Sequence, residues 1–198
     1  KAKWLIIPAI VGASTLLADG MITPAITISS AVEGLAIHNP DIPTVPIVIA
    51  IISFLFLIQR FGTSIVGKVF GPLMLIWFST IGILGFNYID ESPEILKAIN
   101  PFYAIQTIIN YPNALFIIGA IFLCTTGAEA LYSDMGHCGK SNIRVSWIFV
   151  KITLILNYFG QGAYLITQEG KSIGDSNPFF SIMPEWFLFY GVGIATIA

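Results

Sequence analysis

Charged side chains are scarce in this chain of 198 residues: 10% of the residues are charged, whereas 56% are hydrophobic. The mean hydropathy is +0.84. A soluble domain carries about 25% charged residues, so this composition cannot supply a surface that faces water. The net charge of −2 comes with no basic face, so no nucleic-acid partner is expected. The composition predicts a protein embedded in a lipid bilayer.

Sequence signals for secretion, disulfides and catalysis are also lacking. Two cysteines are too few for a disulfide scaffold, and no signal peptide precedes the first apolar stretch. The chain contains no nucleophile elbow, Walker loop, dinucleotide fingerprint or His-Glu-x-x-His motif. His137 and Cys138 have no second His/Cys pair to complete a zinc site. We therefore expect a protein that is not an enzyme and that has no cofactor.

Six apolar stretches are candidates for membrane spans, each of which needs about 20 mostly apolar residues. They cover residues 4–36, 45–60, 66–88, 112–135, 146–167 and 178–198. The first is over-long, so we expect it to tilt or to extend past the hydrocarbon. The last runs to the end of the sequence. We interpret residues 1–198 as a single transmembrane domain, an all-α polytopic fragment of a longer membrane protein.

An amphipathic helix is predicted between the third and fourth spans, over residues 98–110. Its apolar side chains recur at helical spacing: Phe102, Ile105, Ile108 and Ile109. A short helix with one apolar face is typical of a segment that lies in the membrane interface. We therefore expect this connection to contact lipid.

Lysine and arginine alternate between the two sides of these spans. Seven lie at the start, in the second and fourth connections, or in the first turns of the spans that follow these connections: Lys1, Lys3, Arg60, Lys68, Lys140, Arg144 and Lys151. The first, third and fifth connections hold only Lys97 and Lys171. Cytoplasmic loops carry an excess of positive charge, so the Lys1 end is predicted to be cytoplasmic. The first span then runs outward and the fourth runs inward.

The first span contains a polar island around Asp19. Asp19 and Thr23 are four residues apart and share a helical face. Pro24 has no N–H, so the carbonyl of Gly20 loses its usual helical partner. These three oxygen ligands predict a cation site. The alternative is a kinked helix whose aspartate lies at the water interface. Glu33, two heptads beyond Asp19, is either a vestibule charge or part of a solvated helix end.

A second polar island follows the apolar stretch 114–124. Glu129 has Thr126 three residues before it and Tyr132 three residues after it, and Gly127 is the expected point of unwinding. A carboxylate at this depth costs at least about 2.5 kcal/mol, so it should face protein or water. Burial favours its protonated form and a nearby cation favours its ionised form. Proton and cation would then compete for Glu129; the alternative is a structural glutamate paired with a neighbouring helix.

A third polar interruption, in the fifth span, is interpreted differently. Asn157 and Gln161 lie four residues apart within an otherwise apolar stretch. Amide side chains in membrane helices usually hydrogen-bond across to a neighbouring helix. We expect interhelical hydrogen bonds here, and not contact with a ligand.

The motifs of the chain resemble, in order, those of KUP-type potassium uptake permeases (the KUP/HAK/KT family). They are Asp-Gly-Met-Ile-Thr-Pro-Ala-Ile (19–26), Ser-Ala-Val-Glu-Gly-Leu (30–35), Phe-Leu-Ile-Gln-Arg-Phe-Gly-Thr (56–63), Phe-Gly-Pro (70–72), Thr-Gly-Ala-Glu-Ala-Leu-Tyr (126–132), Asp-Met-Gly-His (134–137), Asn-Tyr-Phe-Gly-Gln-Gly-Ala (157–163) and Asn-Pro-Phe-Phe (177–180). The resemblance extends over nearly the whole chain. One departure is Ala18, where the family has glycine; the family's first helix, with its own aspartate, is absent from the chain.

The resemblance implies a fold and a function. The fold is the inverted repeat of amino acid–polyamine–organocation transporters, with six of its transmembrane helices here and the Glu129 span as its discontinuous sixth helix. The function is secondary active potassium uptake across the cell (inner) membrane by K+/H+ symport, with a homodimer formed through a cytoplasmic domain that this fragment lacks. Alternatives are a cation channel or uniporter, an amino acid permease of the same fold, and an intramembrane enzyme.

The resemblance also assigns roles to residues. The cation-site residues of the family map onto Asp19, Thr23, Thr126 and Glu129. Because proton and cation would compete for its carboxylate, Glu129 is the expected proton-coupling residue, with Asp19 as the competing candidate. Further contacts are expected from Gly20, Gly127, Tyr132 and Glu33.

Overall fold

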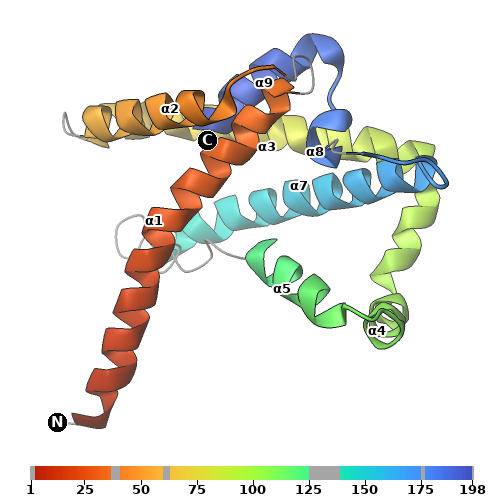
Figure 1. Ribbon diagram of the computed structural model, residues 1–198, viewed down its shortest axis with the longest axis horizontal. Helices are drawn as coiled ribbons and strands as arrows, with labels where there is room; N and C mark the ends of the chain where they lie inside the picture. Colours follow the sequence, from red (N-terminus) through yellow and green to blue (C-terminus); the bar gives the residue numbers. More distant parts are fainter. Residues whose placement is uncertain (1–2, 37–40, 60–62, 125–138, 175–176, 198) are drawn as a thin grey trace. The chain divides into compact units, whose positions relative to one another are not determined.

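A computed structural model describes residues 3–36, 41–59, 63–124, 139–174 and 177–197 (Figure 1). Every regular element in these ranges is a helix, which confirms the all-α prediction. The elements are η1 (Lys3–Leu5), α1 (Ile6–Ala36), α2 (Thr44–Gln59), α3 (Thr63–Glu91), η2 (Pro93–Ile99), α4 (Pro101–Asn110), α5 (Ala114–Cys124), α7 (Lys140–Thr167), α8 (Pro178–Ser181) and α9 (Glu185–Ile197). They form two compact units, one of Lys1–Trp77 with Gly174–Ala198 and one of Phe78–Ile173.

Three of the described helices are long and apolar enough to cross a membrane: Ile6–Gly34, Gly71–Glu91 and Lys140–Thr167. A shorter apolar helix covers Thr44–Leu57. The 31 residues of α1 extend for about 46 Å at 1.5 Å per residue, well beyond a hydrocarbon core of about 30 Å. The over-long first span is thus confirmed, whereas six crossing helices remain a prediction.

The predicted sixth span, 178–198, is wrong as a continuous helix. The structure divides it into α8 and α9, with a break between Ser181 and Glu185. The backbone N–H groups of Phe187 and Leu188 donate to the Pro184 carbonyl at 2.9 and 3.0 Å, so α9 winds from this proline. Proline suits a first helical turn but cannot continue the hydrogen bonds of a preceding one.

Two other helix boundaries differ from the predicted ones. A search for apolar stretches leaves out the polar residues at the ends of a helix, although these residues are still helical. The third predicted span ended at residue 88, but α3 continues through Asp90 to Glu91. The fifth was predicted to begin at residue 146, but α7 begins at Lys140. The amphipathic helix predicted over 98–110 is confirmed as α4, and the 3-10 helix η2 before it was missed.

The first unit is built around the C-terminal half of α1, which packs against α2 and α9 (Figure 1). Its buried apolar side chains come from α1, α3, α8, α9 and the turn between the last two: Ile28, Ala31, Val32, Trp77, Phe180, Ile182, Met183, Leu188 and Val192. A Cβ on Gly34 would lie 2.7 Å from the side chains of Phe180 and Val192. The large apolar side chains of the N-terminal half of α1 are exposed instead.

The second unit centres on a close crossing of α3 and α7. A Cβ on Gly160 would overlap the backbone of Gly85, so the two helices touch main chain to main chain. The buried Asn157 donates from Nδ2 to the Ile81 carbonyl at 3.3 Å, and Gln161 Nε2 donates to Asn157 Oδ1 at 2.6 Å. The predicted interhelical hydrogen bond of Asn157 is therefore confirmed, whereas the hydrogen bond of Gln161 lies within α7.

Candidate cation site

The polar face of α1 is the described part of the candidate site. Asp19, Thr23 and Thr27 follow one another at four-residue intervals, so α1 aligns them along its axis. The Thr27 hydroxyl donates to the carbonyls of Thr23 at 2.7 Å and Pro24 at 3.2 Å. Pro24 lies inside α1, and because it has no N–H, the helical hydrogen bond to the Gly20 carbonyl is missing.

The surroundings of this face are open among the residues that the structure describes. A Cβ on Gly20 would meet no described atom within 4 Å, and Gly20 itself is exposed. Thr23 is half-buried and makes an interaction of its own. The backbone of Asp19 is helical, but its side chain lies outside the described part. The structure therefore aligns Asp19, Gly20 and Thr23 on one helix and leaves room beside Gly20.

The other half of the predicted site lies outside the described residues. Thr126, Gly127, Glu129 and Tyr132 all fall within 125–138. The structure therefore gives no distance between them and α1, and their roles remain predictions. Glu33 is described and exposed, about 21 Å along α1 from Asp19.

Sequence reasoning missed a cavity beside the same face of α1. Its volume is about 220 Å³, and its polar lining comes from Thr27 and Ser30 of α1 and from Asn177 before α8. The other lining residues are Ala31, Phe179, Phe180 and Ala195. The spacing of Thr27 and Ser30 after Thr23 could have identified two of these residues, but no sequence pattern links them to Asn177.

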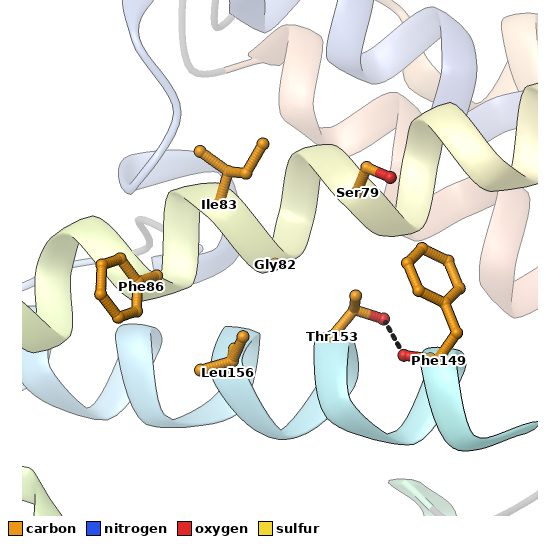
Figure 2. Close-up of a pocket in the computed structure, with 7 residues that line it drawn as sticks. All are labelled: Ser79, Gly82, Ile83, Phe86, Phe149, Thr153 and Leu156. Carbon is orange, nitrogen blue, oxygen red and sulfur yellow. Dashed lines mark hydrogen bonds between the residues drawn. The ribbon is translucent and has the colours of Figure 1, made fainter.

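A larger cavity, of about 380 Å³, lies between α3 and α7 in the second unit (Figure 2). Its walls are mainly apolar, with Ile83 and Phe86 on α3 and Phe149 and Leu156 on α7. The hydroxyl of Thr153 is oriented towards its own helix, where it donates to the Phe149 carbonyl at 3.1 Å. No carboxylate lines this cavity, so it does not offer the chemistry expected of a cation site.

Clusters typical of a tightly held metal are absent from the residues that the structure describes. No three His, Cys, Asp or Glu side chains there lie close enough to hold a metal ion. The described part of the site thus offers the Thr23 hydroxyl and the Gly20 carbonyl, on the helix whose backbone carries Asp19. Such oxygens suit a weakly held monovalent cation better than zinc, which prefers nitrogen and sulfur ligands.

Comparison with known proteins decides the family. The family model described as "K+ potassium transporter integral membrane domain" matches residues 1–198. The chain belongs to this family. The resemblance to KUP/HAK/KT-type permeases is thereby confirmed, and the chain is part of an integral membrane protein.

Three curated relatives show how far the similarity extends. A "Probable potassium transport system protein Kup" of Flavobacterium psychrophilum is 59% identical over the whole chain. A protein of the same name from Cytophaga hutchinsonii is 58% identical over 98% of the chain, and a "Probable potassium transport system protein Kup 1" of Lactococcus lactis subsp. lactis is 53% identical over all of it. The chain spans only 31%, 30% and 31% of these relatives, respectively. No solved structure matches.

The names of the relatives also bear on the expected class of protein. All three are named as potassium transport proteins and none as an enzyme. The prediction that the chain is not part of an enzyme is therefore confirmed.

Proposed function

We propose that the whole protein takes up potassium across the cell (inner) membrane by K+/H+ symport. Membership of a potassium transporter family and the names of the relatives support potassium as the substrate. The observation that carries the proposal is the Gly20 carbonyl of α1, which Pro24 leaves without its helical N–H and which has open space beside it, on the helix that also carries Asp19 and Thr23. Cations in transporters of broken-helix type bind to carbonyls that are freed from helical hydrogen bonds.

In the proposed site, two helices each provide part of the coordination shell. Asp19 and Thr23 come from α1, and Thr126 and Glu129 come from the predicted span 112–135, whose first part is α5. The carboxylates balance the charge of the potassium ion, while the hydroxyls and the backbone near Gly127 replace its water. In the predicted span Tyr132 would follow Glu129 by about one helical turn, and Glu33 would be a charge at the outer end of α1.

The proposed proton step uses one of the two carboxylates. A protonated Glu129 is neutral and binds a cation weakly, whereas an ionised Glu129 binds it strongly. Alternate occupation by proton and potassium would link the two fluxes. Asp19 is the other candidate for this role.

The proposed architecture places the Lys1 end in the cytoplasm and residues 1–198 in one transmembrane domain. Six helices of an inverted repeat would cross the bilayer, with α1 running outward. The positions of lysine and arginine support this orientation. A homodimer through the cytoplasmic domain belongs to the same proposal.

Potassium uptake by the full-length protein tests the site. In cells that lack other potassium importers, Asp19→Asn and Glu129→Gln should each abolish or strongly reduce uptake, because an amide keeps the shape but removes the charge. Glu169→Gln, at an exposed position after α7, is the matched control and should transport normally. Near-normal uptake by both site variants would refute the assignment.

A further inference from the structure

The short helix α4 has an apolar face that the transport site does not use. The side chains of Phe102, Ile105 and Ile109 are 61, 55 and 74% exposed. We propose that α4 lies flat in the membrane interface, with these three side chains among the lipid acyl chains. The partner of this surface is the bilayer itself, on the outer side in the orientation proposed above.

The two faces of α4 are chemically distinct. Positions 102, 105 and 109 share one side of a helix with 3.6 residues per turn, whereas Tyr103 and Thr107, whose side chains carry hydroxyl groups, lie on the opposite side. The helix is stabilised at its start by Asn100, whose side-chain oxygen accepts from the Phe102 N–H at 3.0 Å. A capped helix with an apolar and a polar side suits a lipid–water boundary.

The depth of α4 is set by the segment that precedes it. The side chain of Ile95 in η2 lies 2.7 Å from where a Cβ would be on Gly162, so it occupies the space that a side chain at position 162 would need. Gly162 lies about 8 Å before Thr167, the end of α7. Because η2 rests on the last turns of a membrane-spanning helix, α4 begins close to the level where that helix ends.

A second contact fixes the end of α3 at the same level. The rings of Tyr88 on α3 and Tyr164 on α7 meet edge to face, with centroids 5.7 Å apart. Tyrosine is enriched where membrane helices meet the headgroups. Figure 1 shows α4 almost end-on, so it runs across the direction of α7 within this unit. This is the orientation of a helix that lies in the plane of the membrane.

Charge identifies which part of the lipid α4 would contact. Between Ala98 and Cys124 the sequence has no Asp, Glu, Lys or Arg. The nearest charges, Glu94 and Lys97 in η2, form an exposed ion pair at 3.7 Å. Interfacial helices that bind anionic headgroups use lysine and arginine on their polar faces. We therefore expect α4 to be held by apolar contact, independently of headgroup charge.

Spin labels in the full-length protein test this proposal. The native cysteines, Cys124 and Cys138 among them, are replaced by alanine, and single cysteines at Ile105→Cys and Thr107→Cys are labelled in liposomes. Collision with oxygen should exceed collision with a water-soluble nickel chelate at 105, and the order should reverse at 107. The pair Ile109→Cys and Tyr103→Cys repeats the test if the first pair does not fold. The ratios should be the same in neutral liposomes and in liposomes with anionic lipid.

Three results would overturn the proposal. A label at 105 that collides freely with the nickel chelate would place the apolar face in water. A label at 105 that neither reagent reaches would place it under protein, either another segment or a second copy. Ratios that depend strongly on anionic lipid would show that headgroup charge, and not apolar contact, holds the helix.

Discussion

Gly160 of α7 lies against the main chain of Gly85 of α3, with no room for even one Cβ between them. Interfaces of membrane helices favour small residues because close backbones gain packing energy that lipid cannot supply. The crossing thus defines the relative position of α3 and α7 in the second unit. A single methyl group added at this crossing should therefore disrupt the packing of α3 against α7.

Gly160→Ala should destabilise the protein by about 1–3 kcal/mol, because the added methyl forces the two helices apart. Thermal unfolding of the full-length protein in detergent measures the effect. Gly119→Ala in α5 is the matched control, since a Cβ there would meet no described atom within 4 Å. Equal stability of the two variants would show that α3 and α7 do not approach this closely.

Asn157 and Gln161 should stabilise the same crossing jointly. Asn157 bonds to the Ile81 carbonyl while accepting from Gln161 at 2.6 Å, so removal of either side chain weakens one network. Hydrogen bonds in membrane helices contribute about 0.6 kcal/mol on average and about 1.7 at most. We expect Asn157→Ala and Gln161→Ala to be non-additive in a double-mutant cycle. Strict additivity would mean that the two amides do not interact.

Thr23 should contribute a neutral oxygen to potassium binding. Thr23→Val keeps the shape of the side chain and removes that oxygen, so the KM for potassium uptake should rise. Thr107→Val on α4 is the control, because it removes a hydroxyl that bonds only within its own helix in the structure, to the Tyr103 carbonyl at 2.8 Å. An unchanged KM in the Thr23 variant would remove this residue from the site.

The orientation of the chain can be tested with impermeant thiol reagents on intact cells. With the native cysteines replaced, Ser92→Cys should be labelled from outside, because it lies between α3 and η2 in the predicted outer connection. Ser141→Cys, near Lys140 and Arg144, should react only after the membrane is permeabilised. The reverse pattern would invert the proposed topology.

Local patterns in the sequence predicted the helices well. They also predicted the interhelical hydrogen bond of Asn157, because a polar group in an apolar span needs a partner. An apolar window failed over 178–198, since its average hides the backbone effect of Pro184. The long-range contacts were not predictable in the same way. Asn157 meets a carbonyl 76 residues away, and nothing near Asn157 in the sequence identifies Ile81 as its partner.

The candidate site was likewise predictable only where it depends on local helical geometry. Spacing alone placed Asp19 and Thr23 on one face, because helical geometry relates residues four apart. The cavity that joins Thr27 and Ser30 to Asn177 depends on how α8 and α9 pack against α1, which no local pattern encodes.

The most direct test of proton-coupled uptake is the rate of potassium entry into liposomes that contain the full-length protein, measured against external pH at a clamped membrane potential. The rate should rise as external pH falls, because protons then take part chemically. Glu129→Gln should lose this response, since its amide does not titrate. If the response survives in Glu129→Gln and disappears in Asp19→Asn, the two carboxylates exchange roles. A rate in the unmodified protein that ignores pH at fixed potential would contradict symport and indicate a channel-like uniporter.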